Sequence, residues 1–74
     1  MTLDSRALAD RLHNGPLQLL GAALFKTEMC EQLLALNRGE ELPARLVELR
    51  AALEQATEDL RAIMTDLRHD TTHP

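Results

Sequence analysis

The sequence predicts an all-α fold, an antiparallel two-helix hairpin that dimerises into a four-helix bundle. Two long stretches carry apolar residues at helical spacing, and a short segment with Asn and Gly separates them. Aromatic residues are nearly absent, since the 74 residues include one Phe and no Trp or Tyr. A core of Leu and Ala suits contacts between helices better than a sheet or a nucleotide pocket. We therefore interpret residues 1–74 as a single helical domain.

The first helix is predicted over about residues 4–37, with Asp4 or Ser5 as its N-cap. Leu17, Leu20 and Leu24 widen its apolar face beyond what one partner helix can cover. The apolar residues at helical spacing are Leu8, Leu12, Pro16, Leu19, Leu20, Ala23, Leu24, Cys30, Leu33 and Leu34.

A turn is predicted over residues 38–42. Gly39 would supply the left-handed residue that often ends a helix, and Pro43 would stand where a missing N–H costs nothing. Because the connection is short, we expect the two helices to be antiparallel neighbours.

The second helix is predicted over about residues 43–69, followed by a polar tail at 70–74. Its apolar residues alternate steps of three and four, which is the pattern of a heptad seam. A hairpin alone would leave much apolar surface in water, so we expect a homodimer with twofold symmetry. The seam consists of Leu46, Leu49, Leu53, Ala56, Leu60, Ile63 and Leu67.

The chemistry of the chain is expected at His13, with the amides Asn14 and Gln18 beside it. The neutral ring nitrogen of histidine is a nucleophile that can accept a phosphoryl group at neutral pH. Pro16 cannot donate to the carbonyl of Leu12 and its ring crowds that oxygen, so the helix should bend or loosen beside His13. We expect His13 to project into solvent while Leu12 and Pro16 face inwards.

The segment from His13 to Gln18 resembles the H-D-x-x-x-Q box of the dimerisation-and-phosphoacceptor domain of nitrate-sensor-type histidine kinases. Leu8, Ala9 and Leu12 suit the apolar positions that lead into that box. The resemblance covers nearly the whole chain, since a second helix ending at 67–68 also fits the close of the domain. It implies a partnership with a response-regulator receiver domain and with a separate ATP-binding kinase domain.

The resemblance also implies roles for the three site residues. His13 would carry the phosphoryl group, and Gln18 would orient the water that removes phosphate from the aspartate of a receiver. Asn14 stands where the family has an acid that acts as general base, and an amide cannot take that role. The departure favours a phosphotransfer or phosphatase component over a self-phosphorylating kinase.

Two other functional classes remain open. A non-catalytic dimeric helical module that regulates a histidine kinase or a receiver would need the same apolar seams. His13 would then be a solvated residue and Gln18 an ordinary surface amide. The third reading is a piece excised from a complete sensor kinase.

Composition excludes several partners and sites. A net charge of −4 with scattered basic residues argues against nucleic acid as partner. The longest apolar stretch is far shorter than the roughly 20 residues of a membrane span. Without an N-terminal leader pattern, and with Cys30 as the single cysteine, we expect a cytoplasmic chain. We predict no metal or cofactor site, because His69 and His73 lack further ligands, and we assign Cys30, Met29 and Met64 to packing.

Overall fold

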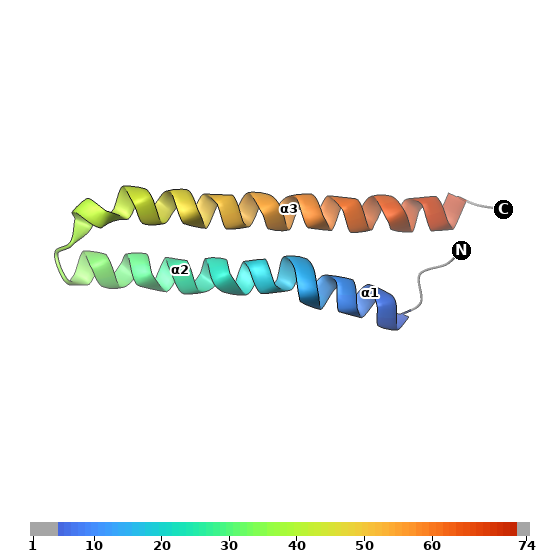
Figure 1. The fold of residues 1–74 in the computed structure, drawn as a ribbon, viewed down its shortest axis with the longest axis horizontal. Coiled ribbons are helices and arrows are strands. Elements are labelled where there is room, and N and C mark those ends of the chain that lie inside the picture. The colour runs from blue at the N-terminus through green and yellow to red at the C-terminus, as the bar shows by residue number, and fades with distance from the viewer. Residues whose placement is uncertain (1–4, 73–74) are drawn as a thin grey trace.

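The structure, a computed structural model, describes the backbone of residues 5–72 and the side chains of residues 5–68. In this range every regular element is helical, and α2 runs antiparallel to α3 in a hairpin (Figure 1). The predicted all-α hairpin is therefore confirmed. Along the chain the elements are α1 (Ser5–Leu12), the π-helical turn η1 (His13–Leu17), α2 (Gln18–Ala35), the 3-10 turn η2 (Gly39–Glu41) and α3 (Leu42–Thr72).

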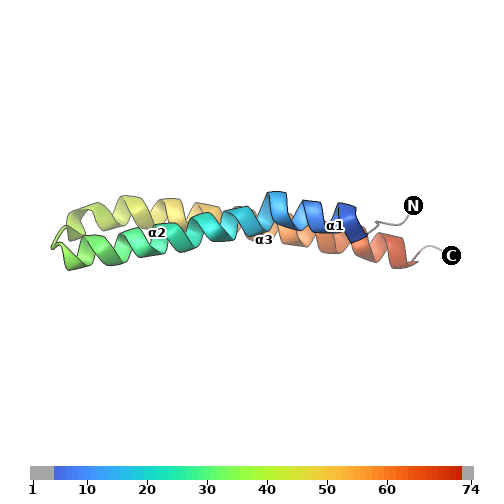
Figure 2. The ribbon, with the colours of Figure 1, turned by 90° about the horizontal axis from the view of Figure 1, so that it is seen from below.

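The hairpin is a thin rod with principal extents of 59 × 18 × 11 Å. Its thinnest dimension equals the diameter of one helix with its side chains. The two helices cross at a shallow angle when the rod is seen edge-on (Figure 2). No third layer covers either broad side within the described chain, so side chains that do not point between the helices meet solvent.

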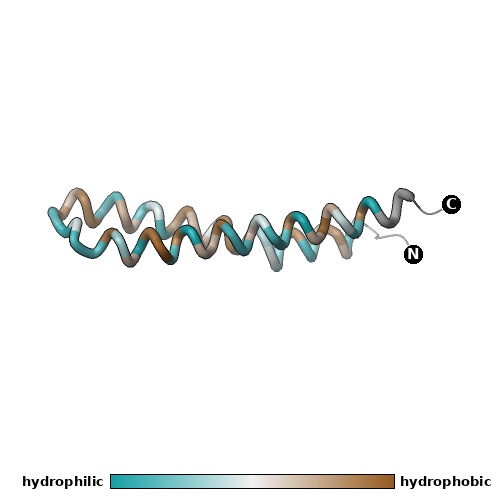
Figure 3. The backbone as a smooth tube through the Cα atoms, turned by 90° about the horizontal axis from the view of Figure 1, so that it is seen from above, coloured by the Kyte–Doolittle hydropathy of each residue, from teal (hydrophilic) through white to brown (hydrophobic). Residues whose placement is uncertain are grey.

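A narrow line of apolar side chains forms the contact between the helices. Ala56 and Ile63 of α3 are buried against the first half of the hairpin, and no polar or charged side chain among the described residues is buried. Apolar and polar residues alternate along both helices (Figure 3). The buried residues of the first half are Pro16, Ala23, Cys30 and Leu33, which confirms the packing role predicted for Cys30.

The predicted seam of the second helix is only half used by the hairpin. Leu46, Leu53 and Leu60 are 51%, 43% and 36% exposed, whereas Ala56 and Ile63 are at most 4% exposed. The line of contact on α3 keeps Ala56 and Ile63. In place of the exposed leucines it uses the half-buried residue before each of them, such as 52 and 59. A two-helix pair buries only the side chains that point between the two axes, and the leucines on the flank remain open.

The helix-ending residue is Asn37, and the prediction of Gly39 is wrong. Asn37 has φ 61°, and no glycine has a positive φ in the described chain. The amide of Arg38 donates to the carbonyl of Leu33 at 2.7 Å, and that of Asn37 donates to Leu34 at 3.2 Å. These two bonds form a Schellman motif, in which Asn is tolerated because its short polar side chain adapts to the left-handed region.

The element bounds differ from prediction at four points. The first helix is interrupted by η1 and ends at Ala35 instead of 37, and the second begins at Leu42 instead of Pro43. The backbone of residues 70–72, predicted as tail, continues α3 because no helix breaker precedes Pro74. Asp4, the alternative N-cap, and the tail residues 73–74 lie outside the described residues.

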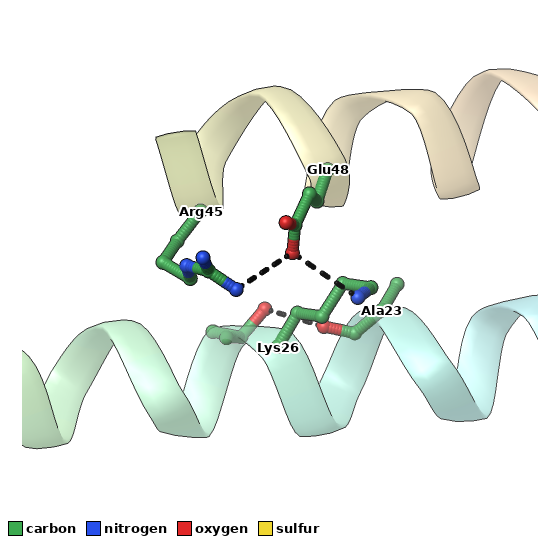
Figure 4. A network of polar contacts seen from close by, with 5 residues as sticks. Ala23, Lys26, Arg45 and Glu48 are labelled. Atoms are coloured by element: carbon green, nitrogen blue, oxygen red, sulfur yellow. Dashed lines mark hydrogen bonds and ion pairs between the residues drawn. The ribbon is translucent and has the colours of Figure 1, made fainter. Parts of the chain in front are cut away.

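Charged side chains tie the helices together near the turn. Glu48 of α3 accepts from Arg45 at 3.1 Å and from Lys26 of α2 at 3.4 Å, as Figure 4 shows. The hydroxyl of Thr27 donates to the carbonyl of Ala23 at 2.9 Å. All three charged side chains are at least 31% exposed, so this cluster contributes little stability and mainly favours one register.

Candidate functional site

The predicted loosening beside His13 is confirmed, because residues His13–Leu17 form a π-helical turn. Pro16 lies inside this turn and has no N–H to donate to Leu12, and a regular turn would press its ring against that carbonyl. The wider π turn relieves the crowding. Leu12 and Gln18, which flank it, have ordinary α-helical dihedrals, so the helix resumes immediately.

The π turn gives His13 and Gln18 a different relation from that of a regular helix. Both side chains are exposed. In an α-helix two residues five apart lie about 140° apart around the axis. A π-helix pairs residue i with residue i+5, so its wider turn brings such residues towards one line along the axis. His13 and Gln18 therefore lie closer to one face than the sequence alone indicates.

The inward-facing residues agree with prediction. Pro16 is fully buried and Leu12 is half-buried, while His13 is exposed. The buried proline ring anchors the π turn on α3, since η1 packs closely along that helix. The imidazole thus stands on a segment that is fixed on one side and open to solvent on the other.

Asn14 belongs to a different surface from His13 and Gln18. It lines a groove of about 310 Å³ between the π turn and α3, and neither His13 nor Gln18 lines that groove. All three predicted site residues are therefore exposed, and of the three Asn14 alone also lines this groove against α3. The groove is lined by Arg11, Asn14, Gly15, Pro16, Asp59, Ala62 and Ile63.

Gly15 of the π turn lies beside Asp59 of α3. A Cβ at Gly15 would lie 3.4 Å from Oδ2 of Asp59. The Asp59 carboxylate is half-buried, and its Oδ1 accepts a hydrogen bond from Nε2 of Gln55 at 3.0 Å. Asp59 was not expected at this site, because it stands one residue before Leu60 of the predicted seam. One sequence signal could have indicated Asp59. It is an acidic residue next to a seam leucine, at the position of the second helix that lies opposite Gly15 when the two helices are antiparallel.

A second residue pair was also missed by sequence reasoning. Nη1 of Arg11, at the end of α1, donates to Oδ2 of Asp66 in α3 at 2.7 Å. The two side chains are 37% and 53% exposed. Like Asp59, Asp66 stands one residue before a leucine of the predicted seam. The two acids share the shifted line of contact, and both face the segment that carries His13.

The arrangement offers a nucleophilic ring and a hydrogen-bonding amide on one exposed segment. The described part of the chain has no group of three or more His, Cys, Asp or Glu side chains placed to hold a metal ion. The side chain of His69 is not described, and His73 lies outside the described residues.

Across residues 5–72 no helix combines the length and apolar character that a bilayer crossing requires. Comparisons with protein-family models, with curated proteins and with solved structures found no match to this chain.

Proposed function

We propose that this chain is a cytoplasmic phosphotransfer domain of two-component signalling, in which His13 exchanges a phosphoryl group with the aspartate of a response-regulator receiver. The observation that carries the proposal is the π turn at His13–Leu17. Such turns occur frequently at functional sites in helices. This π turn carries the exposed imidazole of His13, and the exposed amide of Gln18 lies near the same face of the helix. The buried ring of Pro16 fixes the turn on α3.

The transfer requires an accessible ring nitrogen and little else from this chain. The nitrogen lone pair of His13 bonds to phosphorus as the bond between phosphorus and the receiver's aspartyl oxygen breaks, and the aspartate leaves as a carboxylate. The reverse step returns the group to the receiver. In phosphoryl transfer the protein mainly positions the reactants and offsets charge. An exposed side chain on an anchored helical segment meets the first requirement.

Gln18 and Asn14 have separate roles in this proposal. Gln18 lies near the face of His13, where its amide can hold a water against a phosphoryl group and so promote hydrolysis. Asn14 lines the groove against α3 and bears no group that can take a proton. The domain is therefore a component that receives, passes or removes phosphate, and a separate ATP-binding kinase domain would phosphorylate it poorly.

The proposal includes a homodimer, supported by a set of exposed apolar residues on one side of the hairpin that we call the open face. Each residue of the open face comes directly after a residue that packs against the other helix. In an antiparallel pair, the residues that follow the packed positions of the two helices lie on the same side of the hairpin. They are between 36% and 63% exposed. The open face consists of Leu17, Leu20, Leu24 and Leu34 from the first half and Leu46, Leu53, Leu60 and Met64 from α3.

The exposed area supports a second copy as the occupant of the open face. The chain exposes 5813 Å², whereas a globular protein of its mass would expose about 4,600 Å². The excess exceeds the roughly 800 Å² that each partner buries in a stable interface. Thr27 and Thr57 also lie on this side, and their hydroxyls donate to carbonyls of their own helices at 2.9 and 2.8 Å. The face therefore presents methyl groups, as an isologous helical interface requires.

A transfer assay tests the function directly. The full chain is incubated with receiver domains carrying a ³²P-labelled aspartyl phosphate, and acid-labile, alkali-stable label on the chain is measured. We expect label on the parent protein and on the control His69→Gln/His73→Gln, and none on His13→Gln. Receivers that bind the chain without any transfer to His13 would replace this proposal by the non-catalytic interaction module.

A further inference from the structure

The segment that leads into His13 is weakly attached to the rest of the hairpin. None of the eight residues of α1 is buried. The close backbone approaches of α1 are to η1, whereas η1 and α2 run along α3. In Figure 1, α1 leans away from α3 beyond the π turn. Leu8 and Leu12 are half-buried, so apolar packing fixes the residues before His13 less firmly than the chain from Pro16 onwards.

One charged contact joins this segment to α3 near the site. Arg11 is two residues before His13, and its guanidinium meets Asp66 at 2.7 Å across 55 residues of sequence. Arg11 also lines the groove in which Gly15 meets Asp59. The guanidinium therefore lies against a part of α3 that carries the carboxylates of Asp59 and Asp66, and it forms an ion pair with Asp66. Rotation of α1 about the π turn would break this contact and carry His13 with it.

We propose that Arg11 and Asp66 form a latch that sets the orientation of α1, and through it the presentation of His13. Both act as positioning residues, since neither touches the reacting atoms. The functional half of this inference rests on the proposed phosphotransfer, while the structural half does not. The π turn is the pivot, because Pro16 fixes its far end on α3, while the missing Pro16 amide leaves one helical hydrogen bond unmade beside α1.

The size of the effect follows from the exposure of the pair. Exposed ion pairs are weak, so loss of the latch should shift the position of α1 without unfolding the hairpin. We expect amide hydrogens of residues 6–12 to exchange about two- to five-fold faster in Arg11→Ala, with those of α2 unchanged. The charge-swapped variant Arg11→Asp/Asp66→Arg should restore the parent rate. At about 1 M salt the parent should exchange like Arg11→Ala, because the pair is exposed to screening ions.

The matched control is Lys26→Ala. Lys26 forms the corresponding charge pair between helices near the turn, with Glu48 at 3.4 Å. Its loss removes one interhelical ion pair at a distance from the π turn and should leave exchange in residues 6–12 unchanged. Equal exchange of residues 6–12 in the parent, Arg11→Ala and the swapped variant would overturn the latch. Exchange in the swapped variant that stays as fast as in Arg11→Ala would also overturn it.

Transfer rates separate the latch from the proposed function. With a labelled receiver, Arg11→Ala should lower kcat/KM for label transfer to His13 about two- to five-fold, and the swapped variant should recover it. Altered exchange without any transfer in the parent leaves the latch standing and rejects the phosphotransfer function. Normal transfer in the parent with unchanged hydrogen exchange in Arg11→Ala rejects the latch and leaves the phosphotransfer function standing.

Discussion

The three polar residues around the π turn differ in what surrounds them, and this sets what each can do. His13 begins the π turn and Gln18 directly follows it, and both are exposed, so a docked phosphoryl group can meet both. Asn14 faces the groove against α3, where Arg11 and Asp59 are its charged neighbours. An Asn14→Asp change would place a carboxylate on the side of α3 that already carries Asp59. The substitution therefore does not by itself give His13 a general base.

Substitution of Gln18 tests its proposed role in hydrolysis. Gln18→Ala should slow loss of phosphate from a bound receiver about tenfold or more, because the water loses its orienting amide. The chain's size by light scattering and its affinity for the receiver should not change, since the side chain is exposed. Gln32→Ala, another exposed glutamine of α2, is the matched control. Unchanged dephosphorylation by Gln18→Ala would reject the role.

Asn14→Asp tests the base in the presence of an ATP-binding kinase domain. Because position 14 lines the groove against α3, the new carboxylate should not serve the imidazole, and phosphorylation of His13 should stay low. A rise of about 100-fold, the usual size of general-base assistance, would contradict this expectation. The measurement is ³²P incorporation from ATP, with His13→Gln as the blank.

At the scale of elements, two local irregularities shape the hairpin. The π turn arises from Pro16, and the reversal arises from Asn37 with its left-handed backbone. Each lies where the backbone departs from the α-helix, and each is stabilised by neighbours, the first by burial of the proline ring and the second by the Schellman hydrogen bonds. Gly39, by contrast, has no positive φ, and a Cβ there would meet Leu42 at 3.9 Å, an ordinary contact.

The turn can be tested by paired alanine substitutions. Asn37→Ala should lower the free energy of unfolding by about 1 kcal/mol, since alanine gains nothing locally to offset the left-handed conformation. Gly39→Ala should leave stability unchanged or raise it by about 0.4 to 1 kcal/mol, because it restricts the unfolded chain. Urea unfolding at one fixed protein concentration measures both. A larger loss in Gly39→Ala than in Asn37→Ala would contradict the assignment.

At the scale of the whole molecule, the rod has more apolar surface than a lone hairpin can bury. Two exposed leucine lines, one from each half, lie on the same side and make up the open face. Val47 is 70% exposed but belongs to neither the contact line nor the open face, because it directly follows Leu46 on the outward side of α3. These two environments separate the residues of the proposed dimer interface from ordinary surface residues.

An aspartate substitution distinguishes them. Leu53→Asp should weaken the dimer at least about 100-fold, because the interface would enclose an unpaired carboxylate. Val47→Asp carries the same chemical change outside the interface and should leave the dimer intact. Sedimentation of the two variants over a range of concentrations gives the comparison. A parent protein that is monomeric and well folded at every concentration would contradict the open-face dimer.

The sequence by itself determined the helical class, the antiparallel hairpin, the loosening at Pro16 and the exposure of His13. These follow from periodicity, from the short connection and from the proline's missing N–H, which are local properties of the chain. Only the tertiary structure decided which leucines of α3 face the other helix, that Asn37 reverses the chain, and that Asn14 lines a groove against α3 while Gln18 lies near the face of His13. A heptad pattern fixes which residues share a face but not the rotation of one helix against its neighbour. Asp59 lies beside Gly15 and Asp66 meets Arg11 only because that rotation is set by the packing of Ala56 and Ile63.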